Sequence, residues 1–308
     1  MQIEYKSQPL RQNWDKELPR YWFDNSPFKT HYLNAISIII PAAENVVIHV
    51  IKETRPLLTD PVLKEQIGEM LAQENWHSFS HRKYNEWLTR IGLPAPELTI
   101  QYIHGVQHIK YYVDKYIGQK VWLPLVICGE HMFSATMEYF LERPRLLAQM
   151  HPHFRQAWVW HFLEELEHKG SSMDMWNDTK HIYNYKRWRL HIGFALYMIR
   201  FKVRHFGMVV RLLKHDKQLW KWKTFKDAAV FLFGWDGINV QTFLPLIKIF
   251  KPNFHPWDHD TRYLLTQYAK IAGEEHIDDL QVVQIDAEFQ ACISDIEEAI
   301  NANNIKKY

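Results

Sequence analysis

Glutamates occupy the middle of segments whose other residues have the apolar periodicity of buried helices. Glu44 lies among Ile40, Val47, Ile48 and Ile51, and Glu130 lies among Val126, Ile127, Phe133 and Met137. Burying an ionised carboxylate is costly unless it is paired with an opposite charge or bound to a metal ion. The pattern therefore predicts helices that pack around shared cations.

Two further segments each carry a Glu-x-x-His motif. Glu74 precedes His77, and Glu165 precedes His168. Residues three and four apart lie on one side of a helix, within about 60° of each other. His81 and His161 lie one turn away on the same faces, so each is either an additional metal ligand or a core histidine.

The spacing of these residues predicts two antiparallel helical hairpins. A turn near residues 58–60 lies midway between Glu44 and Glu74, and a break near residues 148–152 lies midway between Glu130 and Glu165. One Glu from each of two helices and a Glu-x-x-His from each of two others form the di-metal site of a four-helix bundle. We expect Glu74 and Glu165 to bridge the ions and Glu44 and Glu130 to be terminal ligands. His77 and His168 would each give one nitrogen.

Proline and glycine divide the chain into helical segments, and no strand pattern is strong. The expected helices cover about 41–54, 61–90, 98–117, 123–147 with a bend at Pro144, 152–181, 187–214, 225–250, 258–271 and 275–301. The predicted fold is all-α, a four-helix bundle with a helical C-terminal extension. Residues 1–35 would be an N-terminal extension, 36–182 the bundle and 183–308 the extension that packs on it as one compact unit.

Three polar residues are candidates for a role beside the ligands. Gln73 and Glu164 each precede a predicted bridging glutamate, and we expect them to orient the histidines through hydrogen bonds. Ser134 follows Glu130 by one turn and would project toward the same cavity, where small hydroxyl residues otherwise fill the core.

The absence of several sequence motifs excludes common classes of enzyme and binding protein. The sequence has no dinucleotide-binding glycine motif, phosphate-binding loop, serine-esterase elbow or H-E-x-x-H motif. Its two cysteines are too few for a disulfide framework, and residues 1–24 contain no apolar signal segment. We expect a bacterial-type cytoplasmic protein, with peripheral contact to the inner membrane as the alternative location.

A basic segment runs from Lys186 to Lys223, with eleven Lys and Arg against one acidic residue, interleaved with aromatic residues. This composition is typical of helices that lie on a membrane surface. The longest apolar run, 192–199, is far shorter than the ~20 residues that span a bilayer. The alternative is a solvated basic face. We expect a small-molecule substrate, which would be lipid-like if this segment contacts a membrane. The other expected partners are a membrane surface, contacted peripherally, and a second copy of the chain in a homodimer. No nucleic-acid-binding module accompanies the segment.

Two runs resemble a known family. They are similar to the bacterial predicted metal-dependent hydrolases. The first run contains Pro41-x-x-Glu44 and Gln73-Glu74-x-x-His77-x-x-x-His81-x-x-x-Asn85. The second is Trp158-x-Trp160-His161-x-x-Glu164-Glu165-x-Glu167-His168-Lys169. The resemblance covers about residues 20–300 and implies a ferritin-like di-iron fold. Oxygen-activating di-iron enzymes with extra histidines, including arylamine N-oxygenases, share this ligand arrangement. Carried over, it implies the ligands Glu44, Glu74, His77, Glu130, Glu165 and His168, with His81 or His161 as additional ligands.

Three functions are compatible with such a site. The main prediction is a di-iron enzyme that oxidises or oxygenates a small apolar substrate with O2 and an external electron donor, because mixed carboxylate and imidazole ligands suit iron. The alternative is a binuclear metal-dependent hydrolase, with manganese or zinc as other candidate metals. The third is a non-catalytic or peroxide-scavenging iron protein.

Overall fold

The computed structural model describes residues 10, 12–15, 17–183, 187–262 and 264–265. Within these residues the chain is helical and forms no strand, which confirms the all-α prediction. The predicted helix 275–301 and half of the predicted helix 258–271 lie outside the described residues. The α-helices are α1 (Pro27–Thr54), α2 (Pro61–Arg90), α3 (Ala95–Tyr116), α4 (Trp122–Leu141), α5 (Pro144–Ala148), α6 (Pro152–Glu167), α7 (Ser171–Tyr183), α8 (Arg187–His215), α9 (Trp222–Phe233) and α10 (Ile238–Ile247).

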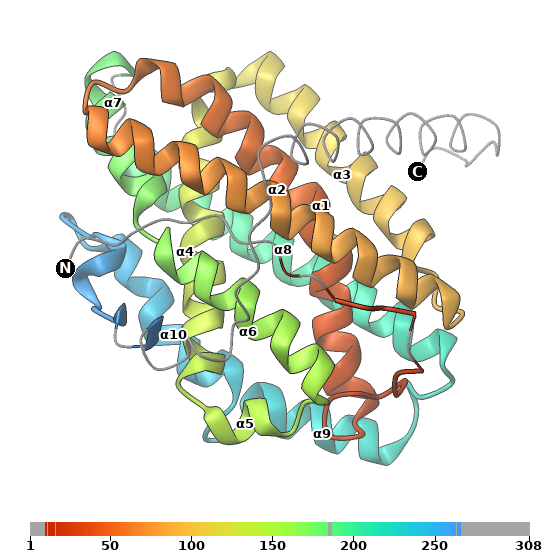
Figure 1. Ribbon diagram of the computed structural model, residues 1–308. Helices are drawn as coiled ribbons and strands as arrows, with labels where there is room; N and C mark the ends of the chain where they lie inside the picture. The colour runs from red at the N-terminus through yellow and green to blue at the C-terminus, as the bar shows by residue number, and fades with distance from the viewer. Residues whose placement is uncertain (1–9, 11, 16, 184–186, 263, 266–308) are drawn as a thin grey trace, which may run out of the picture.

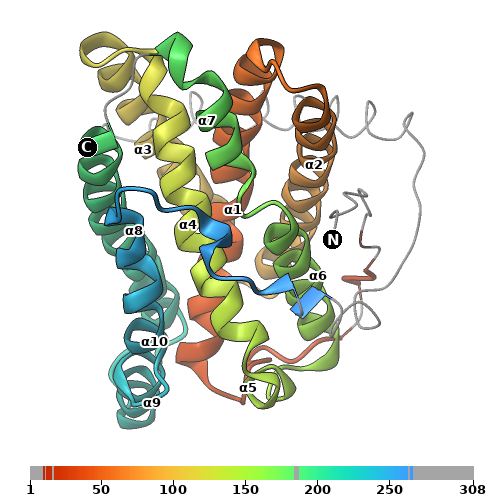
Figure 2. The same ribbon diagram turned by 90° about the vertical axis from the view of Figure 1, so that its left-hand side faces the viewer.

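Helices α1, α2, α4 and α6 form a bundle at the centre of the molecule (Figures 1 and 2). Helix α1 packs against α2 and α4, and α4 packs against α6. An outer set of helices covers this bundle: α3 packs on α1 and α2, α8 packs on α1 and α4, and α10 packs on α4. The two predicted hairpins are therefore present, and they bring residues far apart in sequence to one interior.

Helix α1 starts at Pro27, fourteen residues before the predicted start at Pro41. The prediction of a start at Pro41 was wrong because this proline lies inside the helix, where it cannot donate to the carbonyl of Ser37. The Asn85 side-chain amide of α2 donates to that carbonyl instead, at 3.0 Å. The neighbouring helix thus supplies the hydrogen bond that proline removes.

Two other predicted helices are interrupted. The segment 152–181 divides into α6 and α7, with the break at His168–Gly170, and a Cβ on Gly170 would lie 2.5 Å from the Trp257 ring. The segment 225–250 divides into α9 and α10, because Gly237 brings its backbone so close to residues 232–234 that a Cβ would lie 2.8 Å from their atoms. Both breaks depend on a close approach that only glycine allows, to a distant ring at Gly170 and to the preceding turn at Gly237.

The predicted bend at Pro144 is a complete break. Helix α4 ends at Leu141, and the short helix α5 starts at Pro144. Proline at the first turn of α5 fits because its missing N–H would have no intrahelical acceptor there.

Two segments are long and apolar enough to cross a membrane by length and composition, Pro27–Leu57 and Trp222–Phe250. The first is 72% buried and forms the central helix α1 of the bundle. The second is only 28% buried and is divided between α9 and α10. Core helices of globular proteins pass the same test, so this finding by itself assigns no membrane span.

Asp216, at the end of α8, fastens the N-terminal segment to the helical body. Its carboxylate accepts hydrogen bonds from Arg20 Nε at 3.0 Å and from the Tyr21 hydroxyl at 3.1 Å, and it lies 2.9 Å from His31 Nε2. Burial alone would raise the pKa of Asp216, but the bonds to His31 and Arg20 hold it below the usual range.

We predict that Asp216→Asn lowers the free energy of unfolding at pH 7 by about 2 kcal/mol, since it leaves buried donors with a weaker partner. A carboxylate with a lowered folded-state pKa stabilises the protein above its unfolded pKa, so the difference between the two proteins should shrink below about pH 4. Urea denaturation of both proteins at pH 7 and at a pH below about 4 measures this difference in unfolding free energy. A pH-independent difference would show that the charge of Asp216 is not the cause.

Candidate metal centre

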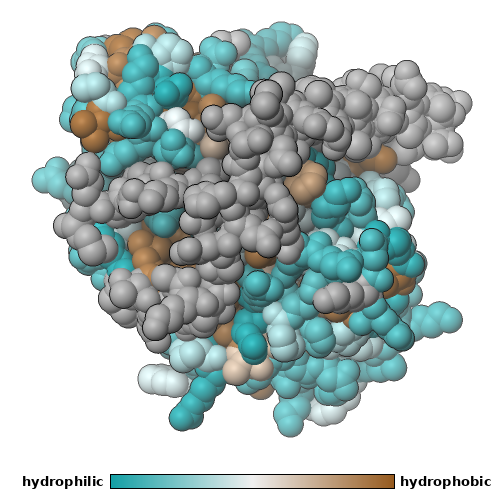
Figure 3. Space-filling model, in the orientation of Figure 1, coloured by the Kyte–Doolittle hydropathy of each residue, from teal (hydrophilic) through white to brown (hydrophobic). Residues whose placement is uncertain are grey.

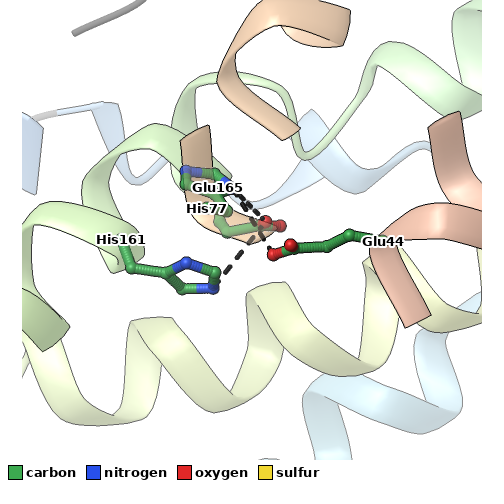
Figure 4. A group of neighbouring side chains, drawn as sticks. All are labelled: Glu44, His77, His161 and Glu165. Carbon is green, nitrogen blue, oxygen red and sulfur yellow. Dashed lines mark ion pairs between the residues drawn. The ribbon is translucent and has the colours of Figure 1, made fainter. Parts of the chain in front are cut away.

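Helices α1, α2 and α6 direct glutamate and histidine side chains to one buried point, and Glu130 of α4 lies beside it. The ligand atoms from α1, α2 and α6 and from His168 form two overlapping groups, and within each group they lie within 4.8 Å of one another. The first contains Glu44, His77, His161 and Glu165, and the second contains Glu74, His77, Glu165 and His168. Figure 4 shows the first group, in which the carboxylates of Glu44 and Glu165 point toward each other and the imidazoles lie beside them.

The distances between these side chains leave space for cations. His77 Nδ1 lies 3.2 Å from Glu165 Oε1 and 3.7 Å from Glu44 Oε1. His168 Nε2 lies 3.8 Å from Glu74 Oε1, and its Nδ1 lies 3.7 Å from Glu130 Oε2. Most of these separations exceed a hydrogen bond, yet they suit two atoms that share one metal ion with bonds of about 2.0–2.2 Å.

Several polar atoms at this point are buried without a hydrogen bond. They include both carboxylate oxygens of Glu44, one oxygen each of Glu74 and Glu130, and both ring nitrogens of His168. Buried polar groups are nearly always hydrogen-bonded in folded proteins. A cluster of unsatisfied oxygen and nitrogen acceptors is therefore a sign of metal ligands, and the donor set fits such ions.

The electrostatics agree with this interpretation. Burial and the charge of Glu165 raise the pKa of Glu44 well above its usual value, and burial and neighbouring carboxylates do the same for Glu74. Burial is the main reason that the pKa of Glu165 is raised to about 8. Burial lowers the pKa of His161, whereas for His168 the charges of Glu165 and Glu130 outweigh burial and raise it. Bound cations would relieve the repulsion among the carboxylates.

Glu164 contacts one of the clustered histidines. Its Oε2 lies 2.8 Å from His77 Nε2, which leaves His77 Nδ1 facing Glu44 and Glu165. A carboxylate on the second nitrogen fixes the tautomer and the ring orientation of a metal-binding histidine. Gln73 has a different position: its amide donates to Glu167 Oε2 at 2.9 Å.

His81 and Ser134 lie outside both groups of ligand atoms. His81 Nδ1 lies 2.9 Å from the Ser37 hydroxyl, and burial lowers the pKa of His81 to about 3. Ser134 donates to the His131 carbonyl at 3.2 Å and lines a small cavity with Glu138 and Lys169. Sequence analysis did not single out Ser37, although its position two turns before Glu44 places it on the same helix face.

A large cavity adjoins the centre on the side of Glu130. Its volume is about 1060 Å³, and it lies between α1, α3, α4 and α8. The walls are mainly apolar, with Val47, Ile109 and Phe133 among them. The sequence gives no direct signal for this cavity, because its walls come from four helices.

Cavities of this size and polarity hold organic substrates. The side of the centre formed by Glu130 is therefore the side on which a bound substrate would lie.

A comparison with known proteins identifies the family. A family model described as "Predicted metal-dependent hydrolase" matches residues 7–260. No curated protein and no solved structure matches the chain. The prediction of O2-dependent oxidation was wrong, since the family corresponds to the hydrolase alternative. The ligands did not distinguish the two, because oxygenases and hydrolases both bind metal ions through glutamate and histidine. Because the match covers most of the chain, this protein belongs to the family of predicted metal-dependent hydrolases.

Proposed function

We propose that the protein is a binuclear metal-dependent hydrolase that cleaves an ester or amide bond. The two overlapping groups of buried glutamates and histidines are the observation that carries this proposal. The family description supports it. The mainly apolar walls of the adjoining cavity favour a substrate with a large apolar group next to the scissile ester or amide bond.

The ligands divide between two ions. His77 can serve only one of them, because its Nε2 faces Glu164. We assign Glu44, His77 and His161 to the first ion, and Glu74 and His168 to the second, with Glu165 between them. Glu130 belongs to neither group and faces the other ring nitrogen of His168, Nδ1, at 3.7 Å. Zinc, manganese and iron all accept such mixed nitrogen and oxygen ligands.

Two divalent ions bound there would supply an activated water and polarise the carbonyl oxygen of the substrate. The chain provides the rest. Glu164 holds the His77 ring in one orientation, and the apolar walls beside Glu130 exclude bulk water and position the substrate.

The ligand assignment predicts different metal contents for two buried histidines. His161→Ala should lose one metal ion per chain, because it removes a ligand of the first group. His81→Ala should keep both ions, because His81 contacts Ser37 instead. Elemental analysis of the purified variants gives the counts, and thermal unfolding checks that both are folded. Equal metal loss in the two variants would contradict the assignment.

The hydrolase proposal predicts metal-dependent cleavage of chromogenic carboxylic esters. Removal of the metal with a chelator should abolish activity, and zinc, manganese or ferrous iron should restore it. Glu164→Gln should lower metal affinity or activity by roughly 10–100-fold, as expected for a residue that orients a ligand.

Thr59→Ala, at a distant exposed site, is the control for Glu164→Gln. Activity that survives complete metal removal would refute a metal-dependent mechanism.

A further inference from the structure

Helix α8 exposes an apolar stripe along its outer side. The stripe consists of Ile192, Leu196, Ile199, Val203 and Phe206, spaced by four and three residues, and all five are exposed. The opposite side of α8 is also apolar and is buried, with Phe194, Phe201 and Leu212 in the core. A helix that is apolar on both sides usually has both sides covered.

Helices α9 and α10 continue this apolar surface. Phe225, Val230 and Phe233 of α9 are exposed, as are Val240, Phe243, Leu244 and Ile247 of α10. Trp222 begins α9, and Trp220 and Trp235 lie beside its two ends; these three rings are 80%, 83% and 92% exposed. Lys202 of α8 donates to Asn239 of α10 at 2.8 Å, which joins the helices. Figure 2 shows α8, α9 and α10 along one side of the molecule.

The charge of this surface is positive. Residues 191–251 contain eleven Lys and Arg and three Asp. The three acids already have partners within the protein: Asp216 binds Arg20, Asp227 accepts from Ser26, and Asp236 pairs with Arg143. Tryptophan and lysine alternate in one exposed stretch, Trp220, Lys221, Trp222 and Lys223. Exposed tryptophan beside lysine is typical of the interface of an anionic bilayer.

The geometry favours a peripheral contact over a span. Helix α9 has 12 residues and α10 has 10, so they are about 18 Å and 15 Å long. A bilayer core is about 30 Å thick. The apolar segment Trp222–Phe250 therefore lies as two short helices, each of which can rest its outer side in the headgroup region.

The large cavity opens within the same surface. Ile192 and Leu196 belong both to the apolar stripe of α8 and to the cavity wall. Exposed Tyr116 and Ile117, at the end of α3, form the wall across from them. Lys120 and Arg200 are exposed there and also line the cavity, where they can contact a lipid phosphate. One continuous apolar path thus leads from the surface to Glu130.

We propose that this surface, formed by α8, α9 and α10, docks on an anionic lipid bilayer and that the cavity receives the hydrocarbon chain of a membrane lipid. The substrate is then an acyl ester or amide whose chain fills the cavity and whose carbonyl lies beside Glu130. The assignment of this carbonyl rests on the proposed function.

The opposite side of the molecule differs from this surface. Figure 3 shows the molecule from the side of α2 and α6, and hydrophilic residues dominate among its coloured atoms.

Vesicle sedimentation tests the docking. The full-length protein should bind vesicles of phosphatidylcholine with phosphatidylglycerol, and bind pure phosphatidylcholine more weakly. The double variants Ile199→Glu/Val203→Glu and Trp220→Ser/Trp222→Ser should each lower the partition coefficient by about tenfold or more. These side chains are exposed and do not line the cavity, so their replacement spares the core.

Val62→Glu, which changes an exposed apolar residue of α2, is the matched control and should bind like the unchanged protein. Failure of the unchanged protein to bind either vesicle would overturn the docking. So would a dimer that these double variants convert to a monomer without vesicle binding, because a second copy would then occupy the surface.

Binding of a fluorescent long-chain fatty acid to the metal-free protein tests the cavity without any catalysis. Val106→Trp fills the cavity from α3 and should weaken binding by about tenfold, whereas Ile103→Trp, on the same helix but outside the cavity wall, should not. No saturable binding, or equal binding in both variants, would overturn this part. Saturable binding without cleavage of any acyl ester would support the cavity and refute only the hydrolase.

Discussion

Mutual repulsion among buried carboxylates is the constraint on which this structure depends. Glu44, Glu74, Glu130 and Glu165 meet in an interior where none can be solvated. Burial, with the charges of neighbouring carboxylates, raises the pKa values of Glu44, Glu74 and Glu165. Removing one partner from such a cluster exposes the others to uncompensated charge. Cations at the centre would reverse the sign of these interactions, so metal binding and the stability of the bundle should be coupled.

The helices around the centre are built to hold it despite local irregularities. Pro41 would weaken α1 three residues before Glu44, but Asn85 of α2 binds the carbonyl that the proline leaves free. His168 lies just beyond the end of α6, and Gly170 turns the chain away under the ring of Trp257. These contacts fix ligands on two helices and concentrate the irregular backbone beside the site.

The outer helices give the centre access to a substrate. Helix α8 forms a wall of the cavity with Tyr197 and Phe201, and its exposed stripe reaches the cavity at Ile192 and Leu196. One helix therefore borders both the route to Glu130 and the surface that we propose to meet a membrane. A polar centre thus lies next to a cavity whose walls are mainly apolar.

The sequence determined the all-α fold, the two hairpins and the ligand types, because helical periodicity and the cost of burying a carboxylate are local properties of the chain. It could not separate His161 from His81, since both lie one turn from a ligand and only packing decides which one faces the other helices. Nor could it decide between oxidation and hydrolysis, because both chemistries use the same ligands. The start of α1, the break at Gly170 and the cavity were decided by tertiary structure, since each arises from contacts between residues distant in sequence.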